Sequence, residues 1–266
     1  MYMADLGDIR LHYRLDGDPA GAPVVFAHAL GTDLRLWDDL IQHLPAGLRI
    51  LRADMRGHGL SDAPTGPYAM GTLVRDLERL IEHLGLRQVV VVGLSIGGMI
   101  AQGLAVKRPD LLRGLVLSNT AAKIGTAGSW QERLATLKAG GIEPLAGPTL
   151  ERWFAPAFRA SPAALRWRHM LTRTPLAGYM GCAAAIGGTD FYTPVSGLRL
   201  PVLGIAGTED GSTPPDLVRE TVALVPGSRF ALIRGAGHLA CVDQPVTYAE
   251  HLSGFLREIG HISSDV

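Results

Sequence analysis

Three side chains suited to nucleophilic catalysis occur in the order serine, acid, histidine along this 266-residue sequence. Ser95 lies in the middle of the sequence GLSIG (residues 93–97), which fits the pattern G-x-S-x-G. A serine hydroxyl is a poor nucleophile until a base takes its proton, and the base needs a carboxylate to orient it. We therefore predict that Ser95 is the nucleophile, His238 the base and Asp210 the acid.

The residues around Ser95 predict a sharp turn between a strand and a helix. Four valines at 89–92 are typical of a strand buried on both faces, and residues 99–108 have the composition of a helix that Pro109 ends. The five-residue pattern also occurs in ordinary glycine-rich turns. The strand before it and the helix after it favour a nucleophile.

The other two predicted catalytic residues are each expected just after a strand. Asp210 follows the apolar run at 202–206, and His238 follows the run at 230–233. Parallel strands gather functional groups at their carboxyl ends, so these positions favour a common site. Glu209 is an alternative acid, but Asp210 lies further from the strand, in a turn-forming Asp-Gly pair.

A tetrahedral intermediate also needs backbone N–H donors for its oxyanion. The Ile96 amide is expected at the positive end of the helix that follows Ser95. The second donor should come from the loop after the strand at 24–27, where we predict the Leu30 amide. His28 in that loop is interpreted as a residue that shapes the loop.

Strands and helices alternate along most of the chain, which predicts an α/β fold with a mostly parallel sheet. The alternation stops after residue 120 and resumes after residue 190. We expect residues 1–120 and 191–266 to form one core domain. Residues 121–190, which show only helical patterns, are expected to form a helical cap over the active site.

The composition narrows the possible partners. Basic and acidic residues balance at 25 each, so neither nucleic acid nor an anionic membrane is an expected partner.

No apolar run approaches the length of a membrane span, and the first eight residues lack the features of a secretion signal, so we expect a cytoplasmic protein. No nucleotide motif or metal-ligand spacing occurs, so no cofactor and no metal are expected. The two cysteines are expected to be reduced and packed.

The sequence as a whole resembles the α/β-hydrolase superfamily. The motif around Ser95, residues 28–31, 56–61 and 235–238, and the order of the predicted strands carry this resemblance. More narrowly, residues 30–34, 117–125 and 151–154 resemble 3-oxoadipate enol-lactonases. That resemblance implies hydrolysis of an enol-lactone to 3-oxoadipate during bacterial breakdown of aromatic acids.

Such a substrate carries a free carboxylate, so its pocket should hold a cation. Residues 121–190 contain six arginines and two lysines against four acids. Ser129 and Glu132 fit a capping box that would start a helix at Trp130. Trp130 and Arg133 would then share an apolar face, with Trp130 as a wall of the pocket and Arg133 as a clamp on the carboxylate. The alternative is that Arg133 extends to solvent.

We therefore expect a serine hydrolase acting on a small anionic lactone or ester, as a monomer or a small homo-oligomer. The alternatives are a carboxylesterase or a cofactor-free perhydrolase or haloperoxidase of the same fold. A non-catalytic receptor of this fold is a third, but it should have lost one of the three catalytic residues, and all three are present.

Overall fold

An eight-stranded sheet forms the centre of the computed structural model, which describes residues 2–263. The strand order is β1-β2-β4-β3-β5-β6-β7-β8, and every pair from β4 to β8 is parallel. β1 and β2 extend one edge in antiparallel pairs. The strands are β1 (Tyr2–Asp5), β2 (Arg10–Gly17), β3 (Ala22–Ala27), β4 (Leu48–Ala53), β5 (Val89–Leu94), β6 (Leu112–Ser118), β7 (Val202–Gly207) and β8 (Arg229–Ile233). The predicted α/β class is confirmed.

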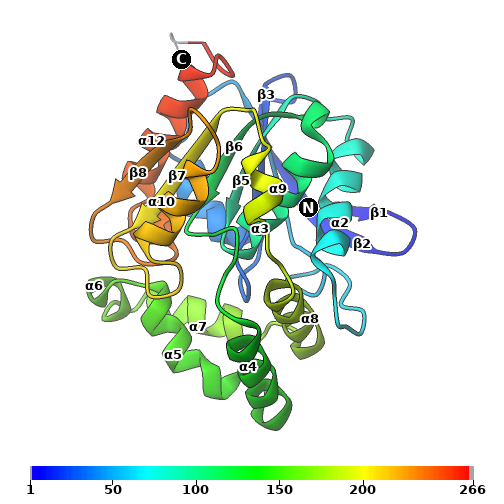
Figure 1. Cartoon of the computed structure of the whole chain (residues 1–266), viewed down its shortest axis with the longest axis vertical. Helices are drawn as coiled ribbons and strands as arrows, with labels where there is room; N and C mark the ends of the chain where they lie inside the picture. Colours follow the sequence, from blue (N-terminus) through cyan, green and yellow to red (C-terminus); the bar gives the residue numbers. More distant parts are fainter. Residues whose placement is uncertain (1, 264–266) are drawn as a thin grey trace.

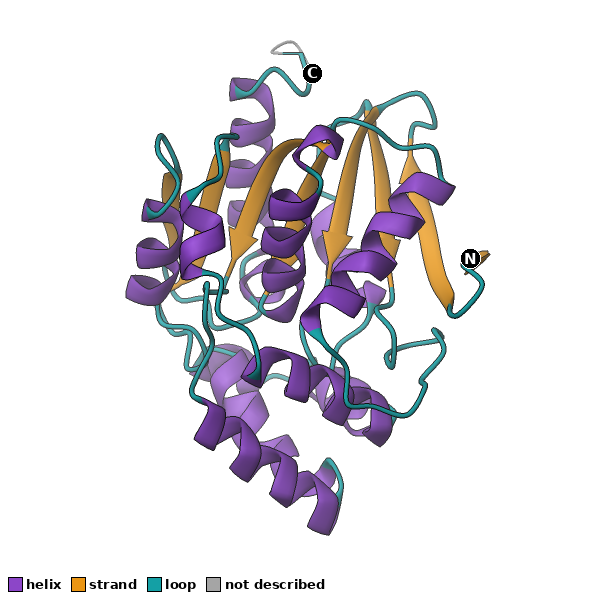
Figure 2. Ribbon diagram, turned by 45° about the vertical axis from the view of Figure 1, so that its right-hand side comes forward, coloured by secondary structure: helices purple, strands orange, loops and turns teal. Residues whose placement is uncertain are grey.

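Helices cover both faces of this sheet, as Figure 2 shows. One face carries α2, α3, α9 and α10, and the other carries α1, α11 and α12. Their bounds are α1 (Asp38–Ile41), α2 (Met70–His83), α3 (Ile96–Lys107), α9 (Tyr192–Ser196), α10 (Pro215–Ala223), α11 (Ala240–Asp243) and α12 (Pro245–Glu258), with short 3₁₀ turns at Leu34–Trp37 (η1) and Pro109–Leu111 (η2). None of the helices within residues 2–263 is long and apolar enough to cross a membrane.

β5 lies in the middle of the sheet, and all six of its residues are buried. Its valines have neighbours on both faces because α3 packs on one side of the strand and the layer of α1, α11 and α12 covers the other face of the sheet. The unbroken β-branched run therefore has a direct physical cause. Its carboxyl end, where α3 begins at Ile96, is fixed by this packing.

Five helices between β6 and α9 form a separate layer, which we call the cap. The layer lies below the carboxyl ends of the parallel strands in Figures 1 and 2. The cap consists of α4 (Ala127–Gly140), α5 (Glu143–Trp153), α6 (Pro156–Arg159), α7 (Ala164–Thr172) and α8 (Leu176–Gly187). It covers the edge of the sheet where the predicted catalytic residues end their strands.

The predicted start of α4 is wrong by one turn. The N-cap is Thr126, whose hydroxyl accepts a hydrogen bond from the Ser129 amide at 3.1 Å. The Ser129 hydroxyl in turn accepts one from the Thr126 amide at 3.0 Å. Ser129 is therefore the third helical residue of a Thr126–Ser129 capping box, and it does not pair with Glu132 as an N-cap would.

The cap contacts the core at positions where glycines allow two backbones to meet. A Cβ on Gly57, in the loop after β4, would overlap the backbone of Gly178 in α8. Gly66 and Gly181 form a similar contact, with a Cβ on Gly66 lying 3.0 Å from Gly181 Cα. Only residues without side chains permit such an approach. The cap is thereby held against the loops that follow the strands.

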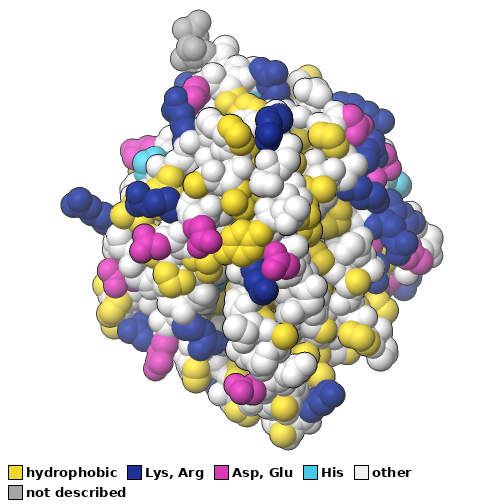
Figure 3. Space-filling model, in the orientation of Figure 1, with side chains coloured by type: hydrophobic (Ala, Val, Ile, Leu, Met, Phe, Trp, Pro, Cys, Tyr) yellow, Lys and Arg dark blue, Asp and Glu magenta, His cyan; other side chains and the backbone are white. Residues whose placement is uncertain are grey.

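Charged side chains of both signs are interspersed on the face of the molecule shown in Figure 3. The basic groups near α2 and α3 are paired with acids: Lys107 with Glu78, and Arg108 with Glu78, Glu82 and Asp110. This mixture agrees with the formal charge of zero.

Gly57→Ala is expected to lower the free energy of unfolding more than Gly47→Ala. Both glycines have a φ of 77°, so each alanine costs about 1–2 kcal/mol of backbone strain. Nothing lies within 4 Å of a Cβ on Gly47, whereas Gly57 faces Gly178, which adds ~1–3 kcal/mol of overpacking. Urea unfolding of the two variants measures the difference. Equal losses would show that the cap does not depend on this contact.

Candidate functional site

Ser95 occupies a strained turn between β5 and α3. Its φ is 58° and its ψ is −119°, a conformation that residues with a side chain rarely adopt. Two bonds from β6 and the loop after it hold the turn: the Ser95 amide donates to Ser118 O at 3.1 Å, and Thr120 Oγ1 donates to Ser95 O at 2.6 Å. A Cβ on Gly97 would overlap the carbonyl of Ala27. The glycine thus lets α3 begin directly beside the end of β3.

The structure brings Asp210 and His238 together. His238 Nδ1 lies 3.0 Å from Asp210 Oδ1 and 2.9 Å from Oδ2, and both residues are buried. A carboxylate only accepts hydrogen bonds, so Nδ1 carries the proton and Nε2 keeps its lone pair. Glu209, the alternative acid, is exposed and accepts a hydrogen bond from Thr208 Oγ1. Asp210 is therefore the carboxylate that orients the imidazole.

Further hydrogen bonds keep Asp210 ionised. The amides of Ser212 and Thr213 donate to Oδ1 at 2.7 and 3.0 Å, and Thr213 Oγ1 donates to Oδ2 at 2.8 Å. Burial raises the pKa of Asp210, but His238 and these donors outweigh burial and hold that pKa below its usual value. The acid is thus fixed in place as an anion.

Asn119 is a partner of Asp210 that the sequence reasoning missed. Its Nδ2 donates to Asp210 Oδ2 at 2.9 Å across 91 positions of sequence. Its φ is 45°, a left-handed conformation that asparagine tolerates better than most residues. The position of Asn119 directly after a predicted strand could have marked it as a candidate site residue. Its contact with Asp210 could be identified only from the folded structure.

Two buried histidines shape the loop that holds Leu30. His58 Nε2 accepts from the Gly31 amide at 3.0 Å, and His28 Nε2 accepts from the Met55 amide at 2.9 Å. Burial, with His28 close by, lowers the pKa of His58 to about 3, and burial also lowers that of His28. Both rings therefore stay neutral, and His28 is a loop-shaping residue as predicted.

The amides of Leu30 and Ile96 remain free in this arrangement. Within residues 2–263 neither amide donates a hydrogen bond to another group, while the neighbouring Gly31 amide is occupied by His58. Leu30 lines the same cavity as Ser95, and Ile96 is the first residue of α3. Two unsatisfied donors beside a serine can receive the oxygen of an attacked carbonyl.

A cavity of about 350 Å³ connects these groups with the cap. Ser95, Leu30 and His238 line its core side, and Trp130 and Arg133 of α4 line its cap side. Neither Ser95 Oγ nor His238 Nε2 forms a hydrogen bond to any other described residue, so both atoms are free to engage a substrate. Arg133 lines this cavity and is half-buried.

Tyr179 of α8 and Trp130 hold the Arg133 side chain. Arg133 Nη2 donates to the Tyr179 hydroxyl, and the guanidinium carbon lies 5.7 Å from the Trp130 ring centre and 5.6 Å from that of Tyr179. The Trp130 indole is itself fixed by donating to Ile124 O at 2.6 Å. Tyr179 and Arg152, which also line the cavity, were not predicted from the sequence.

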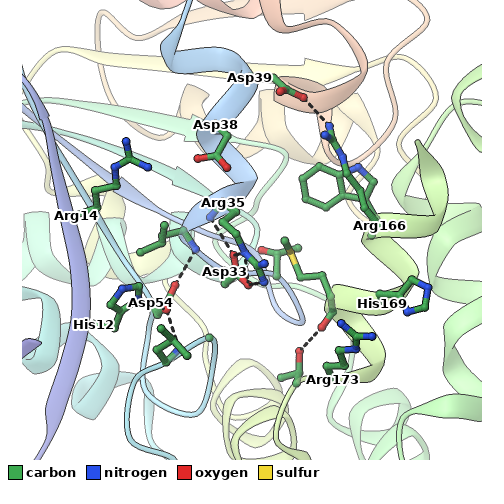
Figure 4. Close-up of a pocket in the computed structure, with 17 residues that line it drawn as sticks. His12, Arg14, Asp33, Arg35, Asp38, Asp39, Asp54, Arg166, His169 and Arg173 are labelled. Carbon is green, nitrogen blue, oxygen red and sulfur yellow. Dashed lines mark hydrogen bonds and ion pairs between the residues drawn. The ribbon is translucent and has the colours of Figure 1, made fainter. Parts of the chain in front are cut away.

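A larger hollow of about 840 Å³ lies elsewhere, between η1, the start of β2 and α7. Figure 4 shows charged side chains around it, and three of its four acids are paired with bases from the same walls. The pairs are Arg35 with Asp33 at 2.6 Å, Arg166 with Asp39 at 2.5 Å, and His12 with Asp54 at 2.7 Å. Neither Ser95 nor His238 lines this hollow.

Asp243 of α11 joins the loop of the base to the cap. Its Oδ2 accepts from the Gly237 amide at 2.6 Å and from the Ala155 amide at 3.2 Å. Burial outweighs these two bonds and raises the pKa of Asp243 to about 6. The carboxyl beside His238 therefore titrates above the ordinary range of aspartate.

Asp243→Asn is expected to become more stable relative to the natural protein as pH rises. The folded pKa is above the unfolded one, so the stabilising contribution of Asp243 is present below about pH 4 and is lost as pH rises through about 6. Asparagine does not ionise and escapes this loss. Urea midpoints at pH 5 and pH 7.5 measure the trend, with the exposed Asp216→Asn as control. A difference between natural and variant protein that is constant with pH would contradict the assignment.

Known proteins share this architecture. The profile of the family described as alpha/beta hydrolase fold matches residues 22–245. The chain is 32% identical to 3-oxoadipate enol-lactonase 2 of Acinetobacter baylyi, with 94% of each chain covered. Two solved structures superpose closely. The enol-lactonase of Burkholderia xenovorans has a TM-score of 0.92 at 31% identity, covering 96% of this chain and 99% of that one. A hydrolase of Pseudomonas aeruginosa has a TM-score of 0.91 at 35% identity, covering 96% and 97%.

These matches span nearly the whole chain, and the site described above lies within the matched residues. The resemblance noted in the sequence is confirmed at the level of the superfamily. The protein is a hydrolase, and it belongs to the α/β-hydrolase fold family.

Proposed function

We propose that the protein is a serine hydrolase that opens a small anionic enol-lactone, such as 3-oxoadipate enol-lactone, through an acyl-enzyme on Ser95. One observation carries the proposal: a single cavity joins Ser95 and His238 to Arg133, whose guanidinium forms no ion pair within residues 2–263. A lactone with a free carboxylate can place its ring carbonyl at the Ser95 end of such a cavity and its carboxylate at the Arg133 end. The similarity to two enol-lactonases supports the same substrate class.

The first step forms the acyl-enzyme. His238 Nε2 takes the proton of Ser95 Oγ as that oxygen bonds to the lactone carbonyl carbon, and Asp210 stabilises the imidazolium through Nδ1–H. The carbonyl oxygen becomes an anion, which the free amides of Leu30 and Ile96 can receive. Donors of this kind lower the barrier by about 2.7–4 kcal/mol each.

Ring opening then breaks the bond between the carbonyl carbon and the ring oxygen. The leaving oxygen is part of an enol, so it departs as a stabilised enolate. The proton that His238 Nε2 took from Ser95 neutralises this enolate as the enol, which tautomerises to the ketone, and His238 becomes neutral again. The leaving oxygen stays attached to the acyl chain, so nothing leaves the cavity at this stage. Water next gives a proton to His238 Nε2 as its oxygen bonds to the acyl carbon, and His238 returns this proton to Ser95 Oγ as the bond between the acyl carbon and Oγ breaks.

The cavity and the cap suit a small substrate. A volume of about 350 Å³ is at the lower end of the range for small-molecule sites, and it suits a short acid better than a long-chain ester. A cytoplasmic role in the breakdown of aromatic acids belongs to the same proposal and rests on the resemblance to the lactonases.

Ser95→Ala is expected to reduce kcat for the enol-lactone by about 10³-fold or more, because the acyl-enzyme can no longer form. The assay compares the enol-lactone, a neutral p-nitrophenyl ester and peracid formation. Alanine lacks only the hydroxyl, so the urea midpoint should stay close to that of the natural protein. Turnover of the lactone that survives the substitution would eliminate Ser95 as the nucleophile. If the natural protein hydrolyses the neutral ester or forms the peracid faster than it opens the enol-lactone, the esterase or perhydrolase alternative would replace the lactonase proposal.

Arg133→Gln is expected to raise KM for the enol-lactone by about 10–100-fold, since a charge-assisted hydrogen bond contributes about 1.5–3 kcal/mol. The increase in KM for the neutral ester should be much smaller. Lys138→Gln is the matched control, because Lys138 is an exposed cation on the same helix. Equal increases for both substrates would remove the clamp role of Arg133.

A further inference from the structure

A second arginine, Arg152, enters the cavity from the last turn of α5. Its stem packs on Gly211, where an added Cβ would lie 3.1 Å from Arg152 Cγ, and its backbone carbonyl accepts from the Gly211 amide at 3.4 Å. Gly211 directly follows Asp210. Arg152 is therefore anchored to the loop of the catalytic acid, while Arg133 is anchored on the other side by Tyr179.

The two guanidinium groups converge on one hydroxyl. Arg152 Nη2 donates to Thr149 Oγ1 at 3.3 Å, and Arg133 Nη2 donates to the same oxygen at 3.4 Å. Burial lowers the pKa of Arg152, and the charge of Arg133 lowers it further. Two like charges at this separation repel one another, and a neutral hydroxyl between them gives little compensation.

Within residues 2–263 no carboxylate lies close enough to form an ion pair with either of these arginines. Among residues 2–263 neither Arg133 nor Arg152 forms an ion pair, although two other cap arginines, Arg166 and Arg168, are paired with acids. Glu151, the chain neighbour of Arg152, is exposed and forms no ion pair with it. Arg133 Nε is buried without a hydrogen-bond partner. A buried charged donor without a partner is costly, so the site is incomplete without an anion.

We propose that Arg152 and Arg133 form a two-arginine site that binds the substrate carboxylate between them, with the Thr149 hydroxyl as their shared acceptor. Each guanidinium presents a planar fork of N–H donors, and a carboxylate has two oxygens to receive them. Arg152 is thereby a specificity-determining residue of the cavity. This inference rests on the proposed function only in taking the substrate to be an anionic acyl compound.

Adipate and its neutral isostere adipamide separate charge recognition from shape. Calorimetric titration into the Ser95→Ala protein measures binding without turnover. We expect adipate to bind more tightly than adipamide, and Arg152→Gln in that background to weaken adipate by about tenfold or more while weakening adipamide much less. Arg152→Lys keeps the charge and the stem over Gly211 but loses the fork of N–H donors. Its affinity for adipate should lie between that of the Ser95→Ala protein and that of the Arg152→Gln variant.

Arg159→Gln in α6 is the matched control, since Arg159 is an exposed cap arginine outside the cavity. A loss of adipate binding by Arg152→Gln no larger than that of Arg159→Gln would overturn the two-arginine site. Equal losses for adipate and adipamide would do the same, because they would show a structural role. Where Arg152→Gln fails to fold, unaltered adipate binding by Arg152→Lys would count against the fork geometry.

The outcomes also separate this site from the proposed function. A protein that binds adipate through Arg152 but does not open the enol-lactone would retain the two-arginine site and lose the lactonase assignment. A protein that opens the lactone with an unchanged KM in Arg152→Gln would retain the lactonase and lose the second arginine.

Discussion

The close approach of α3 to the end of β3 is the constraint on which the rest of the site depends. It exists because Gly97 has no side chain to meet the Ala27 carbonyl. The same approach forces Ser95 into a left-handed backbone conformation and brings the loop of Leu30 beside it. Strain of this kind persists only where the surroundings fix it, and here bonds from Ser118 and Thr120 do so. Nucleophile and oxyanion donors are thus placed by one packing contact.

The last turn of α5 organises the other half of the site. Its backbone carbonyls at Arg152 and Trp153 accept from the Gly211 and Leu239 amides, which flank the acid and the base. The Asp243 carboxylate adds a further link, because it accepts a hydrogen bond from the Ala155 amide of the cap. The cap therefore does more than cover the cavity, because it fixes the two loops on which the Asp210–His238 pair depends.

The sequence alone identified the parts of the structure that have local patterns. The valine run of β5, the turn at Ser95 and the Asp-Gly turn at Asp210 each carry their own signal within a few residues. β1 was missed because it is a four-residue edge strand with one buried side chain, which leaves no periodicity to detect. The start of α4 was misplaced because Thr126 and Ser129 both fit cap patterns, and only the folded backbone chooses between them. Asn119 and Arg152 were missed because their roles arise from contacts between distant segments.

The uneven anchoring of the cap has a consequence for how molecules enter and leave. α5 is hydrogen-bonded to both catalytic loops, and α8 meets the core through paired glycines, so neither can shift without disturbing the site. α4 has a single buried residue, Leu137, and it is held mainly by its packing along α8 and by the hydrogen bonds of Trp130 to Ile124 and of Arg133 to Tyr179. Because α4 carries both Trp130 and Arg133, any movement of this helix that widened the cavity would also displace the side chains proposed to bind the substrate.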